Sequence, residues 1–131
     1  MHKGTISVGT SDFMELVDIT PGIAKALAES KVTDGVCYLY NPHTTAGLTI
    51  NEGADPAVQA DIVTALKKMI PFDLQYRHLE GNSPSHVLAS LFGSSLTVFI
   101  DSGRLQLGTW QKIFFCEFDG PRTRKVHYRF V

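Results

Sequence analysis

Apolar and polar residues alternate along much of the chain, a period of two that is typical of strands. The pattern predicts two short strands within residues 4–19 and single strands at Val36–Tyr40 and Leu48–Glu52. Four further strands are expected at Leu96–Ile100, Arg104–Gly108, Lys112–Phe118 and Lys125–Val131. Because short turns join successive strands, the sheet is expected to be mostly antiparallel.

Three segments change to a helical period, and each begins with a polar residue followed by proline. These starts are Thr20-Pro21, Asp55-Pro56 and Ser83-Pro84. The polar side chain can cap the helix, and proline suits the first turn, where its missing N–H has no partner anyway. The order of strands and helices predicts one compact α+β domain over residues 1–131, a β-sandwich-like sheet with two to three helices.

One stretch, Tyr76–His86, interrupts the apolar pattern and concentrates polar side chains. It contains two imidazoles, His78 and His86, and a third, His43, lies in a loop between two predicted strands. Residues 71–82 show no clear period, and long loops in compact domains are usually functional or disordered. Aromatic rings in this segment argue against disorder, so a functional site is expected on these two loops.

His43, His78 and His86 are the candidate metal ligands. Three neutral imidazoles can bind a divalent metal and leave one position open for substrate or water. Zinc is favoured by ligand type, although nickel, cobalt and manganese also accept imidazole. The spacing matches no standard metal motif, so the alternative is that these rings donate hydrogen bonds to a phosphate or belong to a polar pocket.

Glu52 and His78 are the candidate catalytic residues. A carboxylate at the end of a strand can act as a general base or orient a ligand histidine. For Glu52 the alternative is a solvated strand end or a charge near the start of the following helix. Asp55 is expected to be a helix cap rather than a catalytic group.

Candidate phosphate- and substrate-binding residues are polar groups at predicted strand ends, turns and helix starts: Thr44, Thr45, Asn82, Ser83, Arg104 and Gln111. Asn82, Ser83 and the backbone N–H groups after Pro84 can form an anion cradle at a helix N-terminus. The planar fork of Arg104 can bind two pyrophosphate oxygens, unless it is only an exposed charge beside a turn. Gln111 can bond a ring nitrogen or an exocyclic amine.

Composition narrows the classes of partner. The 131 residues carry a net charge of −1, which argues against a nucleic-acid binder. No apolar stretch approaches the roughly 20 residues that cross a bilayer, and the first residues lack the apolar segment of a signal peptide. A cytoplasmic protein that acts on a small molecule is expected, with Cys37 and Cys116 as core thiols.

Three motifs in order resemble the YjbQ family, also called UPF0047. They are His43–Glu52 followed by Ala54-Asp55-Pro56, Tyr76–His86, and Gly93–Thr97 continuing into Gly103–Gln111. The resemblance implies a compact α+β domain, a homotrimer and a polar pocket lined by the histidines. It also implies a secondary thiamine-phosphate synthase activity, which joins a pyrimidine pyrophosphate to a thiazole phosphate and releases pyrophosphate.

The functional expectation is therefore a transferase of the thiamine-phosphate synthase type, binding a small phosphorylated metabolite and requiring no organic cofactor. The chain lacks the acidic cluster that usually holds Mg²⁺ on a pyrophosphate, which suits a weak activity. Two alternatives remain: a non-catalytic phosphometabolite- or metal-binding protein, and a metal-dependent hydrolase. Part of the aromatic surface of the last strands is expected to pack against a second subunit: Phe114, Phe115, Phe118, Tyr128 and Phe130.

Overall fold

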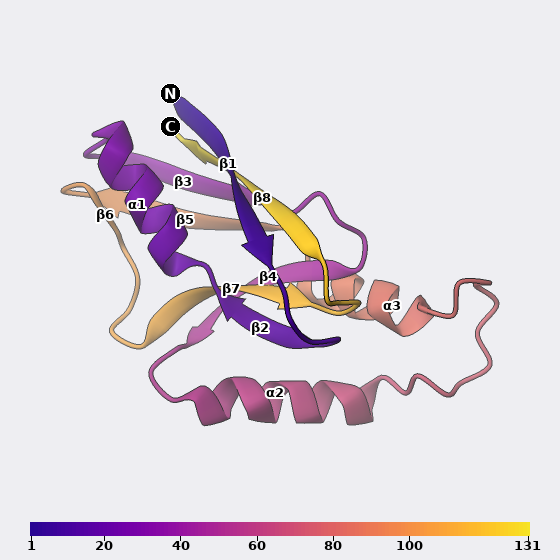
Figure 1. Cartoon of the computed structure of the whole chain (residues 1–131). Helices are drawn as coiled ribbons and strands as arrows, with labels where there is room; N and C mark the ends of the chain where they lie inside the picture. Colours follow the sequence, from indigo (N-terminus) through magenta and orange to yellow (C-terminus); the bar gives the residue numbers. More distant parts are fainter.

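The computed structural model describes residues 1–131, and its eight strands form two antiparallel sheets that share one core (Figure 1). The strands are β1 (His2–Gly9), β2 (Glu15–Asp18), β3 (Gly35–Tyr40), β4 (Ala46–Glu52), β5 (Ser95–Asp101), β6 (Arg104–Leu105), β7 (Gln111–Glu117) and β8 (Thr123–Phe130). One sheet has the order β1-β8-β3-β5-β6 and the other β2-β7-β4. The α+β, sandwich-like architecture expected from the sequence is confirmed.

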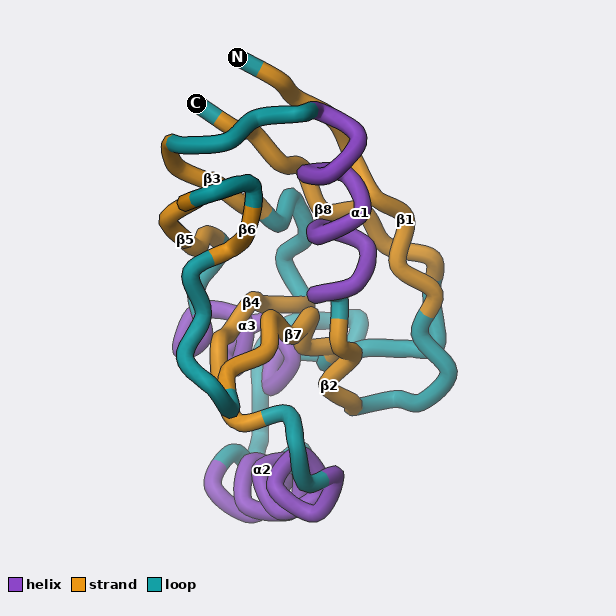
Figure 2. Tube along the Cα trace, turned by 90° about the vertical axis from the view of Figure 1, so that its left-hand side faces the viewer, coloured by secondary structure: helices purple, strands orange, loops and turns teal.

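Three helices complete the fold: α1 (Thr20–Ser30), α2 (Pro56–Met69) and α3 (Ser83–Phe92). Ile23 and Leu27 of α1 are buried in the core between the two sheets. Residues of α2 and α3 join a second core with the far side of the three-stranded sheet, through Leu66 and Leu88. Figure 2 shows α2 on the side of that sheet opposite to the five-stranded sheet. The three-stranded sheet is therefore covered on both faces.

This double cover explains the apolar run of β7. Ile113 and Phe115 belong to the core between the sheets, while Phe114 and Cys116 belong to the core beneath α2 and α3. A strand buried on both faces is expected to be apolar at successive positions rather than at alternate ones. Cys37 and Cys116 are both fully buried, and burial raises the pKa of the Cys37 thiol to about 12.

The two cores also limit the expected subunit surface. Phe114, Phe115, Phe118 and Phe130 are buried within the chain, and Tyr128 is half-buried and stacks on Phe130 with ring centroids 4.9 Å apart. The four phenylalanines therefore fill the chain's own cores, and Tyr128 is the one member of this set that keeps surface for a second subunit. The large aromatic side chains that remain exposed include Tyr38, Tyr40 and Phe99, on β3 and β5.

The three helices begin where the sequence predicts, but only one has the expected cap. Asp55 accepts the backbone N–H of Ala57 at 2.9 Å. Thr20 is already helical, and its hydroxyl accepts the N–H of Ile113 at 2.7 Å. Ser83 is likewise the first helical residue, and Asn82 before it makes no cap bond with its side chain. The predicted strand Arg104–Gly108 is shorter than expected, since β6 ends at Leu105.

None of the helices combines the length and the apolar character that crossing a membrane requires.

Candidate functional site

An open polar cavity of about 430 Å³ lies where four segments of the chain meet. None of its eleven lining residues is hydrophobic: Pro42, His43, Thr44, Thr45, His78, Glu80, Asn82, His86, Asp119, Arg122 and Arg124. They come from the loop before β4, the loop leading into α3 together with the start of that helix, the turn after β7 and the start of β8. Small-molecule cavities usually have mostly apolar walls, so this one is suited to a strongly polar group.

Sheet register brings these segments together. Ala46 of β4 pairs with Glu117 of β7, so the loop before β4 and the turn after β7 leave the sheet at the same end of these two strands. The hydroxyl of Ser85, in the first turn of α3, donates to the carbonyl of Phe118 at 2.6 Å. That buried bond holds the N-terminus of α3 against the same end of the strands.

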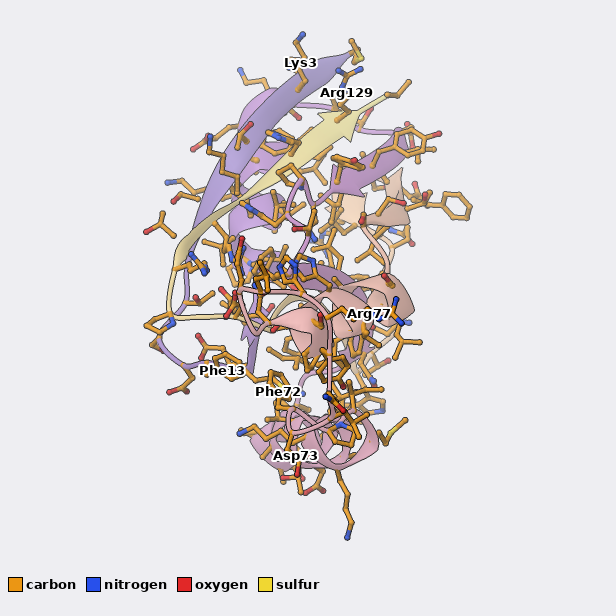
Figure 3. The ribbon with its side chains drawn as sticks, turned by 90° about the vertical axis from the view of Figure 1, so that its right-hand side faces the viewer. Lys3, Phe13, Phe72, Asp73, Arg77 and Arg129 are labelled. Carbon is orange, nitrogen blue, oxygen red and sulfur yellow. The ribbon has the colours of Figure 1, made fainter.

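The loop before α3 is held by aromatic contacts. Phe72 packs edge to face against Phe13 with ring centroids 5.3 Å apart. Figure 3 shows the two labelled side chains close together. The hydroxyl of Tyr76 donates to the carbonyl of Pro71 at 2.5 Å. With this end of the loop anchored, His78 and Glu80 lie exposed at the rim of the cavity.

The three histidines line one cavity but differ in environment. The rings of His78 and His86 meet edge to face with centroids 5.3 Å apart. His43 is half-buried, and its Nε2 accepts the backbone N–H of Lys125 at 2.9 Å. Burial and the charge of Arg124 hold the pKa of His43 below its usual range. His43 is therefore neutral near pH 7, with its proton on Nδ1.

This arrangement does not fit the three-histidine metal site expected from the sequence. With Nε2 accepting a hydrogen bond and Nδ1 protonated, His43 has no free lone pair for a metal ion. No three side chains among the histidines, cysteines and acidic residues are placed to hold an ion together. The histidines are instead positioned as hydrogen-bonding groups, the alternative that the sequence left open.

Two ion pairs form the wall between β7 and β8. Glu117 and Arg124 are buried and bond through both carboxylate oxygens, with Arg124 Nε 2.9 Å from Oε1. Burial opposes ionisation of Glu117, but the bonds from Arg124, Thr10 and the backbone N–H of Asp119 outweigh it and lower the pKa of its carboxyl. Nearer the surface, Arg122 Nη2 lies 3.2 Å from Asp119 Oδ2.

Asn82 connects this wall to α3. Its Nδ2 donates to Asp119 Oδ2 at 3.0 Å. Its Oδ1 is buried and is the one buried side-chain nitrogen or oxygen in the chain without a hydrogen-bond partner. An acceptor in this position favours a proton donor from outside the chain, either water or a ligand.

The structure brings together six of the residues predicted from the sequence: His43, Thr44, Thr45, His78, Asn82 and His86. Ser83 follows Asn82 but does not line the cavity. The sequence missed Glu117, Asp119, Arg122 and Arg124. A charged residue at the end of the apolar run of β7, followed by a turn and two arginines, was the one available signal.

Glu52, Gln111 and Arg104 do not belong to the cavity, which corrects their predicted roles. Glu52 pairs with Gln111 at the opposite end of β4 and β7, about 20 Å along the seven-residue strand. Its carboxylate accepts the N–H of Asp55 at 3.1 Å near the start of α2. Arg104 lies in β6, at the edge of the five-stranded sheet, and pairs with Asp101 of β5.

Comparison with known proteins agrees with the fold and spans nearly the whole chain. Residues 4–131 match the family described as "UPF0047 protein YjbQ-like". The chain is 52% identical to UPF0047 protein MJ1081 of Methanocaldococcus jannaschii, covering 95% of this chain and 90% of that protein. It is 44% identical to UPF0047 protein YugU of Bacillus subtilis, covering 97% of each. A crystal structure from Clostridium acetobutylicum, described as an uncharacterized conserved protein of the yjbq/upf0047 family, superposes with a TM-score of 0.94 at 50% identity, covering 97% of this chain and 98% of that one.

Proposed function

The chain belongs to the UPF0047 protein YjbQ-like family, and we propose that its polar cavity binds the phosphate groups of a small phosphorylated metabolite. The observation that carries the proposal is a cavity of about 430 Å³ with no hydrophobic lining residue. Arg122 and Arg124 supply guanidinium donors, and the neutral His43 supplies an Nδ1–H. A flat ring would find no apolar wall here, so the phosphate end of a metabolite fits the cavity best.

The N-terminus of α3 adds a favourable dipole to this donor set. Asn82 at the cap position and His86 in the first turn both line the cavity. Pro84 has no N–H, and the N–H groups of Ser85 and His86 donate to the carbonyl of Asn82, which corrects the backbone anion cradle expected after Pro84. What remains is the helix dipole, which favours negative charge at this end. The helix therefore directs its positive end toward the same space as the two arginines.

The reaction we propose is of the thiamine-phosphate synthase type, in keeping with the family resemblance. The bond between the pyrimidine methylene carbon and the pyrophosphate oxygen breaks, and the electron pair leaves with pyrophosphate. The thiazole nitrogen then forms a bond to that carbon. Guanidinium and imidazole donors would stabilise the charge that develops on pyrophosphate, so catalysis rests on positioning and electrostatics.

Binding without turnover is the second candidate, because the same donors can hold a phosphate group without any bond being broken. Since Nε2 of His43 already accepts a backbone N–H, this imidazole is a hydrogen-bond donor in either function. A metal-dependent hydrolase is the least supported function, since the three histidines are not placed to hold a metal ion together.

An assay of pyrophosphate release from the pyrimidine pyrophosphate, with and without the thiazole phosphate, tests the proposal. Release that needs both substrates, falls strongly in Arg122→Gln and persists in Arg104→Gln would support the transferase. Binding of pyrophosphate without release would leave the non-catalytic function. A protein that binds neither substrate nor pyrophosphate would overturn the proposal altogether.

We further propose a homotrimer in the cytoplasm, as the resemblance implies. Tyr38 and Tyr40 of β3 and Phe99 of β5 are about half or more exposed, at 48, 55 and 67%. They lie on neighbouring strands of the five-stranded sheet, on the face directed away from the core. Exposed aromatic side chains that gather on one face support contact with another subunit.

A further inference from the structure

Glu117 is a buried carboxylate that does not itself line the cavity but bonds to two residues that do, Arg124 and Asp119. It is fully buried at the end of β7. Oε1 accepts from Arg124 Nε at 2.9 Å and from the hydroxyl of Thr10 at 2.7 Å. Oε2 accepts from Arg124 Nη2 and from the backbone N–H of Asp119 at 3.0 Å. A carboxylate offers about four acceptor sites, so Glu117 has none left for a ligand.

Arg124 is held by these bonds with one donor edge free. Its Nη2 also donates to the hydroxyl of Thr45 at 3.0 Å. Its Nη1 makes no hydrogen bond within the chain. Since Arg124 lines the cavity, Nη1 is the guanidinium nitrogen left over for a ligand.

Asp119 has the complementary arrangement. Oδ2 accepts from Asn82 and Arg122, at 3.0 and 3.2 Å. Oδ1 makes no hydrogen bond within the chain, and the Asp119 side chain is 16% exposed. The Asp119 side chain thus presents a free acceptor in the cavity, next to an amide whose own oxygen lacks a donor.

We propose that Glu117 is a positioning residue that fixes Arg124 as donor and Asp119 as acceptor, so that the cavity selects a phosphorylated ligand with an amino or hydroxyl group close to its phosphate. The inference rests on the proposed function and specifies its substrate class. A phosphate oxygen takes the free edge of Arg124, and the amino or hydroxyl proton is accepted by Asp119. A phosphate ester without such a group leaves the acceptors of Asp119 and Asn82 unpaired, which costs affinity.

Two small probes of similar size test this selection by calorimetry on the intact protein. The first, 2-aminoethyl phosphate, carries an ammonium group, and the second, ethyl phosphate, lacks it. The wild type is expected to bind the first about tenfold more tightly, the value of one hydrogen bond to a charged group. In Asp119→Asn this ratio should fall toward one, while ethyl phosphate still binds.

Glu117→Gln tests the positioning role. In this variant an NH₂ group replaces one of the two carboxylate oxygens. It faces an N–H group of Arg124 or Asp119, so one of these two residues must move. The ratio between the probes should therefore collapse, whereas a purely structural role would weaken both probes alike and keep the ratio. If Glu117→Gln does not fold, Asp119→Asn, whose side chain is partly exposed, still decides the selection.

The outcomes separate this inference from the proposed function. Tight binding of both probes by the wild type with a ratio near one would overturn the inference and leave the phosphate site intact. Absence of binding by either probe would overturn both. A ratio that survives in folded Glu117→Gln would show that Glu117 does not position the pair.

Discussion

At the scale of single residues, the pair of Glu117 and Arg124 is the most consequential interaction in the structure. Both side chains are buried, and every acceptor site of the carboxylate is filled. Removing one partner of such a pair leaves an uncompensated charge, which typically costs about 3–5 kcal/mol. The same pair holds a cavity wall in place, so its contributions to stability and to binding are linked.

The pair gives the protein a defined dependence of stability on pH. The folded state lowers the pKa of Glu117 below its unfolded value of about 4.3. Its contribution is thus present above pH ~4.3 and is lost as the pH falls through the folded pKa. In urea unfolding from pH 7 to pH 3, the difference in free energy of unfolding between wild type and Glu117→Gln should shrink toward acid. A difference that stays constant over this range would contradict the assignment.

The sequence predicted part of the site at this scale. The imidazoles and Asn82 could be found because two loop segments concentrate polar groups. Glu117 could not be assigned, because an acidic residue at the end of an apolar strand has no local sign of its partner. Arg124 is close to Glu117 in sequence. However, the bond between Glu117 and Thr10 joins residues 107 positions apart, and the bond between Arg124 and Thr45 joins residues 79 positions apart.

At the scale of elements, the three helix starts share one sequence device but not one geometry. Proline lies in the first turn of each helix, yet only Asp55 accepts an N–H as a cap. Thr20 uses its hydroxyl to bind the backbone of β7 instead. The positions of the helices could be predicted from the proline and the period, whereas the bond that a capping residue makes depends on its neighbours in space.

Substitutions at two of these starts should therefore differ. Asp55→Ala removes an observed cap bond and should lower the free energy of unfolding by about 1 kcal/mol. Ser83→Ala removes no cap bond and should change it by less than about 0.5 kcal/mol. Chemical denaturation of both variants measures the contrast. Equal losses would argue against the different capping described for α2 and α3.

At the scale of the whole molecule, the covered three-stranded sheet decides which surfaces are free. The order of elements and the antiparallel sheets follow from periodicity and short turns. The burial of Phe114 and Phe118 did not, because it depends on α2 and α3 covering the second face of the three-stranded sheet. The places of Glu52 and Gln111 could not be predicted either. They lie at the end of β4 and β7 that is remote from the cavity, which depends on how these two strands pair.

Subunit contact is predicted through the outer face of the five-stranded sheet. Tyr40→Glu places a charge among exposed aromatic residues of β3 and β5 and should convert a trimer into monomers in light scattering. Met69→Glu, at an exposed position on α2, is the control and should keep the mass of the wild type. A wild type that is monomeric at micromolar concentration would rule out the trimer.

The most direct test of the account is the affinity for inorganic pyrophosphate of the wild type, Arg122→Gln and Arg104→Gln. Arg122 lines the cavity and has a side chain that is 54% exposed, so its substitution should leave the fold intact. Arg104 lies away from the cavity at the edge of the five-stranded sheet. We predict about tenfold weaker binding in Arg122→Gln and no change in Arg104→Gln. Equal losses in both variants, or no binding by the wild type, would contradict a phosphate site in the polar cavity.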